Sequence, residues 1–225
     1  MSYILNIETA TKNCSVSVSK KGSILTIREL NTGAYSHAEV LHSFIKEVLD
    51  EAGLVPSDLN AIAVSKGPGS YTGLRIGVSA AKGLCFSLQI PLISIDTLAS
   101  LAHRVTLESG VVVPMLDARR MEVYSAVFNE EYCMVRTIKA EIIQPDSFLE
   151  YLESGTVYFV GDGAEKCKAV IQHPNAIFVD GMFPSAKEMC SLAYEKYKKN
   201  ELEDVAYFEP FYLKDFLVVP QKKKI

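Results

Sequence analysis

The sequence predicts an α/β protein of two similar domains, each with a mixed sheet flanked by helices. Three short alternating stretches open the chain, and segments typical of helices and strands then alternate. The same succession begins again near residue 111 without obvious repetition of sequence. The length of 225 residues suits two domains of about 100 residues each. Because a mixed sheet covered by helices buries such elements economically, we expect the order βββαβαβ in each half.

In the first half, three strands joined by tight turns precede two helices. The stretch "YILNIETAT" alternates and then turns, residues 14–18 alternate strictly, and "SILTIREL" follows a Lys-Gly turn. Residues 36–39 read "SHAE", a capping box that predicts a helix from about 37 to 52, which ends at Gly53. A buried strand, "NAIAVSKGPG", a second helix over residues 71–89 and the strand "PLISIDT" complete this half.

The second half is expected to repeat this arrangement. A helix around 98–107 leads to three strands at 111–118, 122–129 and 132–143. A helix near Phe148 and the strand "VYFVGDG" come next. A short helix, the strand "AIFVD" and a helix over 185–199 complete this half. We place an N-terminal domain at residues 1–104 and a C-terminal domain at 105–225. The basic end of the chain, Lys222–Lys224, is expected to be a flexible tail.

Composition favours a cytoplasmic protein that does not bind nucleic acid strongly by itself. The net charge is −4 and the pI about 5.6, whereas proteins that bind nucleic acid unaided usually carry a basic face. The five cysteines are scattered without a C-x-x-C pair, which argues against disulfides and structural zinc. The start "MSYILNIETA" lacks the features of a signal peptide, and no stretch approaches about 18 apolar residues, so we expect no membrane association.

The stretch "SKGPGSYTGLRIG", residues 65–77, raises the question whether its glycines hold a phosphate. A dinucleotide fingerprint needs G-x-G-x-x-G, but the glycines here fall at 67, 69 and 73. A Walker A loop needs a lysine after its last glycine, but Leu74 follows Gly73. Neither motif is met, although backbone amides at the start of the next helix can attract an anion.

The helix that follows this stretch has one face almost without side chains. Gly73, Gly77 and either Ala80 or Ala81 recur three or four residues apart, so they share that face. Because a glycine inside a helix costs about 1 kcal/mol relative to alanine, we expect another backbone to pack closely there. That backbone belongs either to this domain's own sheet or first helix, or to a helix of a partner.

Candidates for independent chemistry are few. His37 and His42 are five residues apart, so they do not share a helical face as a metal-binding pair would. No G-x-S-x-G elbow appears, and no cysteine lies in a recognisably reactive context. The charged turn with Asp117, Arg119 and Arg120 reads either as ordinary strand-turn charges or as part of an interface.

Several blocks together resemble the TsaB (YeaZ) family. They are "ILNIETAT", "CSVSVS", "SKGPGSYTGLRIGVSAAKGL", "ISIDTLASLA", "MLDARRMEVY", "GDG" and "PFYLK", in the family's order and over nearly the whole chain. The resemblance implies two actin-like (ASKHA, ribonuclease H-like) domains. Within that superfamily the turns at 7–11 and 161–165 are similar to phosphate hairpins, although each also reads as an ordinary turn.

The resemblance also implies a role and partners. TsaB proteins are non-catalytic subunits in the formation of threonylcarbamoyladenosine, at N6 of the adenosine 3′ of the anticodon in tRNAs that read ANN codons. They bind and activate the catalytic subunit TsaD, which holds the metal, together with the ATPase TsaE. They form homodimers when the partner is missing. By this resemblance the chain is no enzyme, binds no cofactor of its own, and meets tRNA only through the complex.

The resemblance places the dimer and partner surface on the two helices of the first domain. The residues that it implies are Leu41, Phe44, Ile45, Val48, Gly73, Arg75, Gly77, Ala80, Ala81 and Leu84. Two departures weaken any claim to independent catalysis: Glu8 stands where the family's first turn commonly has Asp, and the metal-binding histidine pair of TsaD is missing. The alternatives are a small-molecule kinase or ATPase of the actin-like fold and, third, a metalloprotease, which would need a metal cluster.

Overall fold

A mixed sheet forms around the N-terminal strand. The computed structural model describes residues 2–33 and 37–214. Within this part, the first sheet contains β1 (Tyr3–Glu8), β2 (Cys14–Lys20), β3 (Ser23–Leu30), β4 (Ala61–Gly67) and β5 (Leu92–Asp96), in the order β3-β2-β1-β4-β5. β1 pairs antiparallel with β2 and parallel with β4. Because successive side chains of a strand face opposite sides, Leu5 and Ile7 point into one core and Ile4 into another.

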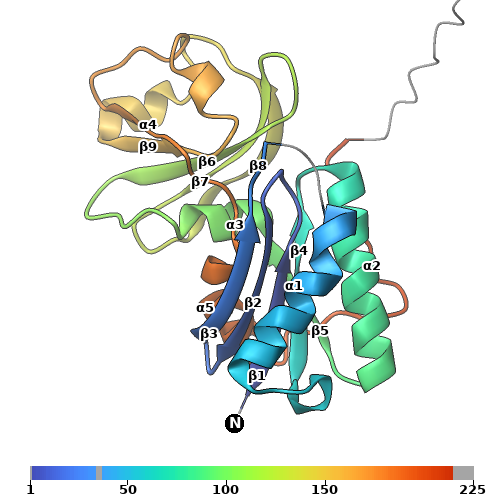
Figure 1. Cartoon of the computed structure of the whole chain (residues 1–225). Coiled ribbons are helices and arrows are strands. Elements are labelled where there is room, and N and C mark those ends of the chain that lie inside the picture. Colours follow the sequence, from blue (N-terminus) through green and yellow to red (C-terminus); the bar gives the residue numbers. More distant parts are fainter. Residues whose placement is uncertain (1, 34–36, 215–225) are drawn as a thin grey trace, which may run out of the picture.

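Two helices cover one face of this sheet. α1 (His37–Ala52) and α2 (Tyr71–Leu88) lie side by side on it (Figure 1), and the short helix η1 (Pro56–Asp58) leads from α1 to β4. Their inward side chains join the core with Leu5 and Ile7; these are Leu41, Ile45, Val48, Leu49, Val78, Ala81 and Cys85. α2 begins after Ser70, whose hydroxyl accepts a hydrogen bond from the amide of Gly73, an ordinary N-cap.

The second half of the chain repeats the strand order. Its sheet contains β6 (Val111–Asp117), β7 (Glu122–Phe128), β8 (Met134–Ile142), β9 (Val157–Val160) and β10 (Ala176–Val179), in the order β10-β9-β6-β7-β8 among the described residues. β6 therefore takes the place that β1 has in the first sheet. α4 (Leu149–Ser154) and η2 (Glu165–Cys167) cover one face, and α3 (Thr97–Ala102), which follows β5, packs on the other.

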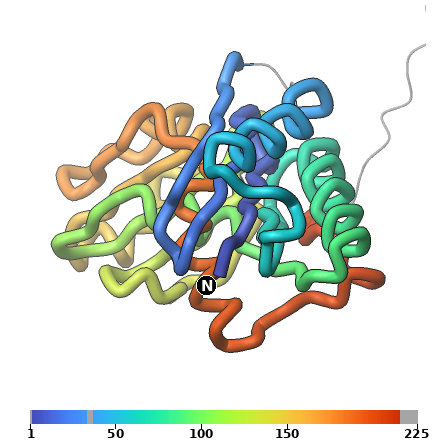
Figure 2. The backbone as a smooth tube through the Cα atoms, turned by 60° about the horizontal axis from the view of Figure 1, so that its bottom comes forward, coloured from blue at the N-terminus to red at the C-terminus, as the bar shows by residue number. Residues whose placement is uncertain are grey.

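The end of the chain returns to the first sheet. α5 (Ala186–Lys198) packs on the face opposite α1 and α2, where Met189 and Ala193 meet Ile4 and Ile93. The C-terminal segment (residues 201–214) then pairs with β5 through a bridge between Leu92 and Glu203 and continues to α2. Figure 2 shows this segment in red, passing from the region of the N-terminus toward α2. The last part of the predicted C-terminal domain thus completes the packing of the first sheet.

The predicted fold class, two mixed sheets flanked by helices, is confirmed. The helices expected at 37–52 and 71–89 appear as α1 and α2, but the helix expected at 98–107 already ends at Ala102. The division at residues 104 and 105 stays a prediction. Ser36 of the capping box and the tail Lys222–Lys224 lie outside the described residues. Among the described helices, none is long and apolar enough to cross a membrane.

Candidate functional site

The glycine-rich loop packs directly on the first turn of the same domain. The hydroxyl of Thr9 donates to the carbonyl oxygen of Gly73 at 2.8 Å, and the amide of Ser70 donates to the carbonyl oxygen of Ala10 at 2.6 Å. A Cβ at Gly69 would lie 2.5 Å from that Ala10 oxygen, so only glycine fits there. The loop and the turn are therefore packed in direct contact, which is possible because the glycines of the loop have no side chains.

The same explanation holds for the glycine face of α2. A Cβ at Gly73 would lie 2.2 Å from the carbonyl oxygen of Thr9, and one at Gly77 would lie 2.2 Å from the Thr9 hydroxyl. Both glycines are buried. The close neighbour thus belongs to the same domain, although it is the turn after β1 and not the sheet or the first helix, and the expectation that Gly73 and Gly77 contact a partner is corrected.

Glu8, at the end of β1, points into the protein interior. Its side chain is fully buried, and Oε1 accepts hydrogen bonds from the amide of Ala10 at 2.6 Å and from the hydroxyl of Ser65 at 3.0 Å. Burial raises the pKa of Glu8 from 4.5 to about 7. Oε2 is buried without a hydrogen-bond partner among the described residues. In this arrangement the carboxyl group is closed off from solvent.

A cleft of about 620 Å³ separates the loops of the two sheets. The first turn, the glycine-rich loop and residues 211–214 line one part of it, and Asp117, Arg119 and Asp162 line the opposite part. The amide of Asp117 donates to Asp162 at 3.0 Å, and Lys166 forms an ion pair with the Asp117 carboxylate. Burial raises the pKa of Asp162. The turns at 117–120 and 161–165 are thus joined by one hydrogen bond, and Lys166, directly after the second turn, adds an ion pair with Asp117.

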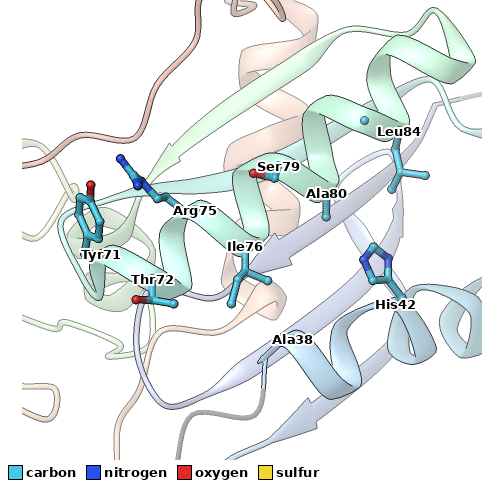
Figure 3. A pocket seen from close by; sticks show the side chains of 10 residues that line it. Ala38, His42, Tyr71, Thr72, Arg75, Ile76, Ser79, Ala80 and Leu84 are labelled. Atoms are coloured by element: carbon cyan, nitrogen blue, oxygen red, sulfur yellow. The ribbon is translucent and has the colours of Figure 1, made fainter.

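An apolar groove of about 770 Å³ runs between α1 and α2. Ile76, Ala80 and Leu84 of α2 point toward α1, and His42 points back from α1 (Figure 3). Polar and small residues complete its lining; these are Ala38, Tyr71, Thr72, Arg75, Ser79 and Gly83. The groove has an apolar floor and a partly polar rim, which is the composition of many protein-binding surfaces.

Four of the residues expected at the partner surface remain accessible. Arg75, Ala80 and Leu84 line the groove, and Phe44 is half-buried nearby on α1. The others are corrected: Leu41, Ile45, Val48 and Ala81 are buried in the chain's own core, as are the two glycines at Thr9. The physical reason is that their face of α1 and α2 packs on the first sheet.

Sequence reasoning listed Arg75, Ala80 and Leu84 of this groove but not Ile76, which lies between them on α2. Ile76 lies four residues from both Thr72 and Ala80, beside the polar stripe of Arg75 and Ser79, so helical spacing could have indicated this seam. Tyr71 and His42 were not expected in the groove. His42 is exposed there, whereas His37 is buried and its Nε2 lies 2.7 Å from the carbonyl oxygen of Thr11. Within residues 2–33 and 37–214, no group of three or more His, Cys, Asp or Glu is placed to hold a metal.

Two sheets of equal strand order, facing each other across a cleft lined by loops, define a two-domain protein of the actin-like fold. Residues 31–218 match the family described as "TsaD: tRNA N6-adenosine threonylcarbamoyltransferase". Over 220 residues the chain is 30% identical to "tRNA threonylcarbamoyladenosine biosynthesis protein TsaB" of Escherichia coli (strain K12), with 94% of each chain covered. The chain therefore belongs to the TsaB (YeaZ) family.

Two further relatives cover the chain to a similar extent. A protein of the same name from Bacillus subtilis (strain 168) is 28% identical over 221 residues, which are 94% of this chain and 93% of the relative. The solved structure "YeaZ from Pseudomonas aeruginosa" superposes with a TM-score of 0.84 at 29% identity, covering 95% of this chain and 100% of its own. Both similarities span the two sheets and not one domain alone.

Proposed function

We propose that the chain acts in threonylcarbamoyladenosine biosynthesis on tRNA as a non-catalytic subunit. In this role it binds and activates a TsaD-like catalytic subunit in the cytoplasm, together with a TsaE-like ATPase, and it meets tRNA only through the complex. The names of its relatives support the pathway, because the similar proteins from E. coli and B. subtilis are named for this biosynthesis. The division of labour within the complex is our inference from the geometry of the site.

The closed glycine-rich loop carries this proposal. Transfer of a carbonyl group to an adenine amino group needs charge stabilisation at the developing oxyanion, which an actin-like cleft supplies through phosphate-binding loops and a bound metal. In this chain the amide of Ser70 donates to the carbonyl oxygen of Ala10, and the Glu8 carboxyl is turned inward. The amide of Ser70 and the carboxyl group of Glu8 therefore form hydrogen bonds within the chain itself, and neither group is free to bind a phosphate or its metal.

The groove between α1 and α2 is the surface that we assign to the partner. Its apolar floor, with Ile76, Ala80 and Leu84, can bury side chains of another helix, while Arg75 offers a charged group at the rim. The same surface would pair with a second copy when the partner is missing, in an isologous dimer. Binding free energy gained at this groove would hold the catalytic subunit in its active arrangement.

The cleft between the sheets keeps a second candidate open, an actin-like kinase or ATPase. Its volume of about 620 Å³ lies within the range of small-molecule sites, roughly 300–1,000 Å³. A purified chain that hydrolyses ATP faster than a Ser70→Pro variant, in which the capped start of α2 is disturbed, would favour this candidate. We expect no turnover by either protein.

Co-purification tests the proposed partnership. The chain and the TsaD-like protein of the same organism are mixed and passed over a size-exclusion column, alone and together. The proposal expects a joint peak and the disappearance of the chain's own dimer. Separate elution at concentrations well above those of the cell contradicts the proposal.

A further inference from the structure

The turn between β6 and β7 carries two neighbouring arginines. Arg119 and Arg120 are both exposed, and Arg119 lines the cleft between the sheets. Their φ values are 73° and 52°, a left-handed conformation that glycine and asparagine adopt at lower cost than arginine. The chain therefore has arginine at two positions where the backbone would favour other residues, which indicates a function for the side chains.

Side chains around this turn fix its backbone. Lys166 donates to the carbonyl oxygens of Arg120 and Glu122, at 2.8 and 2.7 Å, and forms an ion pair with the Asp117 carboxylate. The same carboxylate accepts a hydrogen bond from the amide of Arg119 at 2.9 Å. The two arginine side chains thus start from a backbone that is held in one position, as a binding site requires.

The nearby carboxylates do not neutralise the two arginines. Asp117 is paired with Lys166, and Glu122 is paired with Lys214. Among the described residues, neither guanidinium group of the turn forms a hydrogen bond or an ion pair. The turn therefore carries two positive charges that are unpaired in this part of the chain, although the protein as a whole has a net charge of −4.

Aromatic rings line the cleft beside Arg119. They include Tyr71, Tyr124 and Tyr212. Burial raises the pKa of Tyr124, and the charges of Lys214 and Arg119 oppose that shift, so Arg119 lies close to this ring. Basic groups among aromatic rings are typical of surfaces that bind RNA, because guanidinium groups pair with phosphates and unpaired bases stack on the rings. A carboxylate of a protein partner would use the guanidinium groups but not the rings.

We propose that Arg119 and Arg120 bind phosphate groups of the tRNA when the chain is part of its complex. The identity of this RNA rests on the proposed function. Two phosphate contacts are too few to hold a tRNA on an acidic chain alone, so they add to the contacts made by the catalytic subunit. Since phosphate contacts fix orientation without reading sequence, the turn positions the tRNA relative to that subunit.

The test variant combines Arg119→Asn with Arg120→Gly. Both new residues suit the left-handed backbone, so the turn should fold at least as stably as in the wild type, which thermal unfolding checks. The matched control combines Lys139→Ala with Lys199→Ala. These two lysines are exposed on β8 and after α5, so the control removes the same charge away from the turn.

The salt dependence of tRNA binding measures the contact. Each protein is first assembled with the TsaD-like subunit, and labelled tRNA is titrated by fluorescence anisotropy between about 50 and 200 mM salt. Each phosphate contact adds about 0.7–0.9 to the slope of log affinity against log salt, so the arginine variant should lower the slope by about 1.4–1.8. Its binding should be about tenfold weaker or more at the lowest salt, and this difference should shrink about tenfold at the highest. The lysine control should keep the slope of the wild type.

Assembly with the TsaD-like subunit separates this inference from the proposed function. Normal assembly of both variants, with a reduced slope for the arginine variant alone, supports the tRNA contact. An unchanged slope, or an equal reduction in the lysine control, overturns the contact and leaves the proposed function standing. Loss of assembly by the arginine variant alone assigns the arginines to the protein partner and also overturns the contact. If the wild type itself does not assemble, the proposed function fails and the tRNA contact fails with it.

Discussion

The hydroxyl of Thr9 donates to the carbonyl oxygen of Gly73 at 2.8 Å, and the same hydroxyl lies 2.2 Å from the place where a Cβ at Gly77 would stand. This contact joins the first turn to α2 across 64 residues of sequence. It explains why a helix that is otherwise apolar keeps two glycines one turn apart.

We expect Gly77→Ala to destabilise the fold. The added methyl group meets the Thr9 hydroxyl, and overpacking of this kind costs about 1–3 kcal/mol, more than the gain of about 1 kcal/mol in helix propensity. Gly83→Ala is the matched control, because nothing lies within 4 Å of its Cβ position, and it should stabilise by roughly 0.5–1 kcal/mol. Urea denaturation measures both variants.

Thr9→Ala provides the second half of this test. It removes the hydroxyl that Gly77→Ala would meet, so the double variant should be less unstable than the sum of the two single changes. Equal stability of Gly77→Ala and Gly83→Ala would show that Thr9 does not limit the helix.

Glu8→Gln should make the protein more stable at neutral and alkaline pH. Burial raises the pKa of Glu8 from 4.5 to about 7, so between these values the unfolded chain loses a proton that the folded chain keeps. The free energy of unfolding therefore falls as the pH rises from 4.5 to about 7 and then levels off. The variant lacks this loss, and its advantage should grow to roughly 3 kcal/mol at most.

The measurement for Glu8 is the difference in unfolding free energy between the wild type and Glu8→Gln, from about pH 5 to about pH 8. Taking the difference removes the titration of other buried acids, such as Asp96 and Glu188, whose pKa values burial also raises. A difference that does not change with pH would place the Glu8 carboxylate in contact with water.

Leu84→Asp should weaken partner binding strongly without unfolding the chain. Leu84 lines the groove at a half-buried position, and a carboxylate there would be desolvated by any apolar partner. We expect a loss of at least about 2 kcal/mol, roughly thirtyfold in affinity, by titration with the TsaD-like subunit. Val135→Asp is the control, since Val135 is 51% exposed on β8 of the other sheet. If both variants bind equally well, the interface lies away from the groove.

One thiol should react quickly in the folded protein. Cys133 is exposed, whereas the other four cysteines are buried, and burial raises the pKa of Cys14 and Cys85 to about 12 and that of Cys167 to about 11. A colorimetric thiol reagent should find one fast equivalent in native protein and five in denaturant. Cys133→Ser should remove the fast phase, and a second fast equivalent would contradict the described packing.

Helical spacing was sufficient to predict α1 and α2 but not to choose between their faces. Leu41, Ile45 and Val48 form an apolar stripe that fits a partner's helix as well as the chain's own sheet. Because both helices are apolar on most sides, each has two faces that could pack against another element. Only the sheet decides which face is covered, and it covered Leu41, Ile45 and Val48, which the prediction had placed at the partner surface together with accessible residues such as Arg75 and Leu84.

Contacts over long sequence separation explain the other gaps. The glycine face correctly predicted a close backbone neighbour, but no local pattern indicates that this neighbour is the turn at Thr9. The buried carboxyl of Glu8 accepts a hydrogen bond from Ser65, which lies 57 residues further along the chain on the neighbouring strand β4. The C-terminal segment has no strand or helix period, and its path is set by single bonds such as those from Lys82.

Reconstitution of the modification with each component omitted tests the central claim most directly. tRNA is incubated with the chain, the TsaD-like and TsaE-like proteins, and threonylcarbamoyl-adenylate or its precursors, and its nucleosides are then analysed. We expect threonylcarbamoyladenosine only when the chain and the TsaD-like protein are both present, and no modification or ATP turnover by the chain alone. Full modification without the chain, or modification by the chain unaided, would contradict its assignment as a required, non-catalytic subunit.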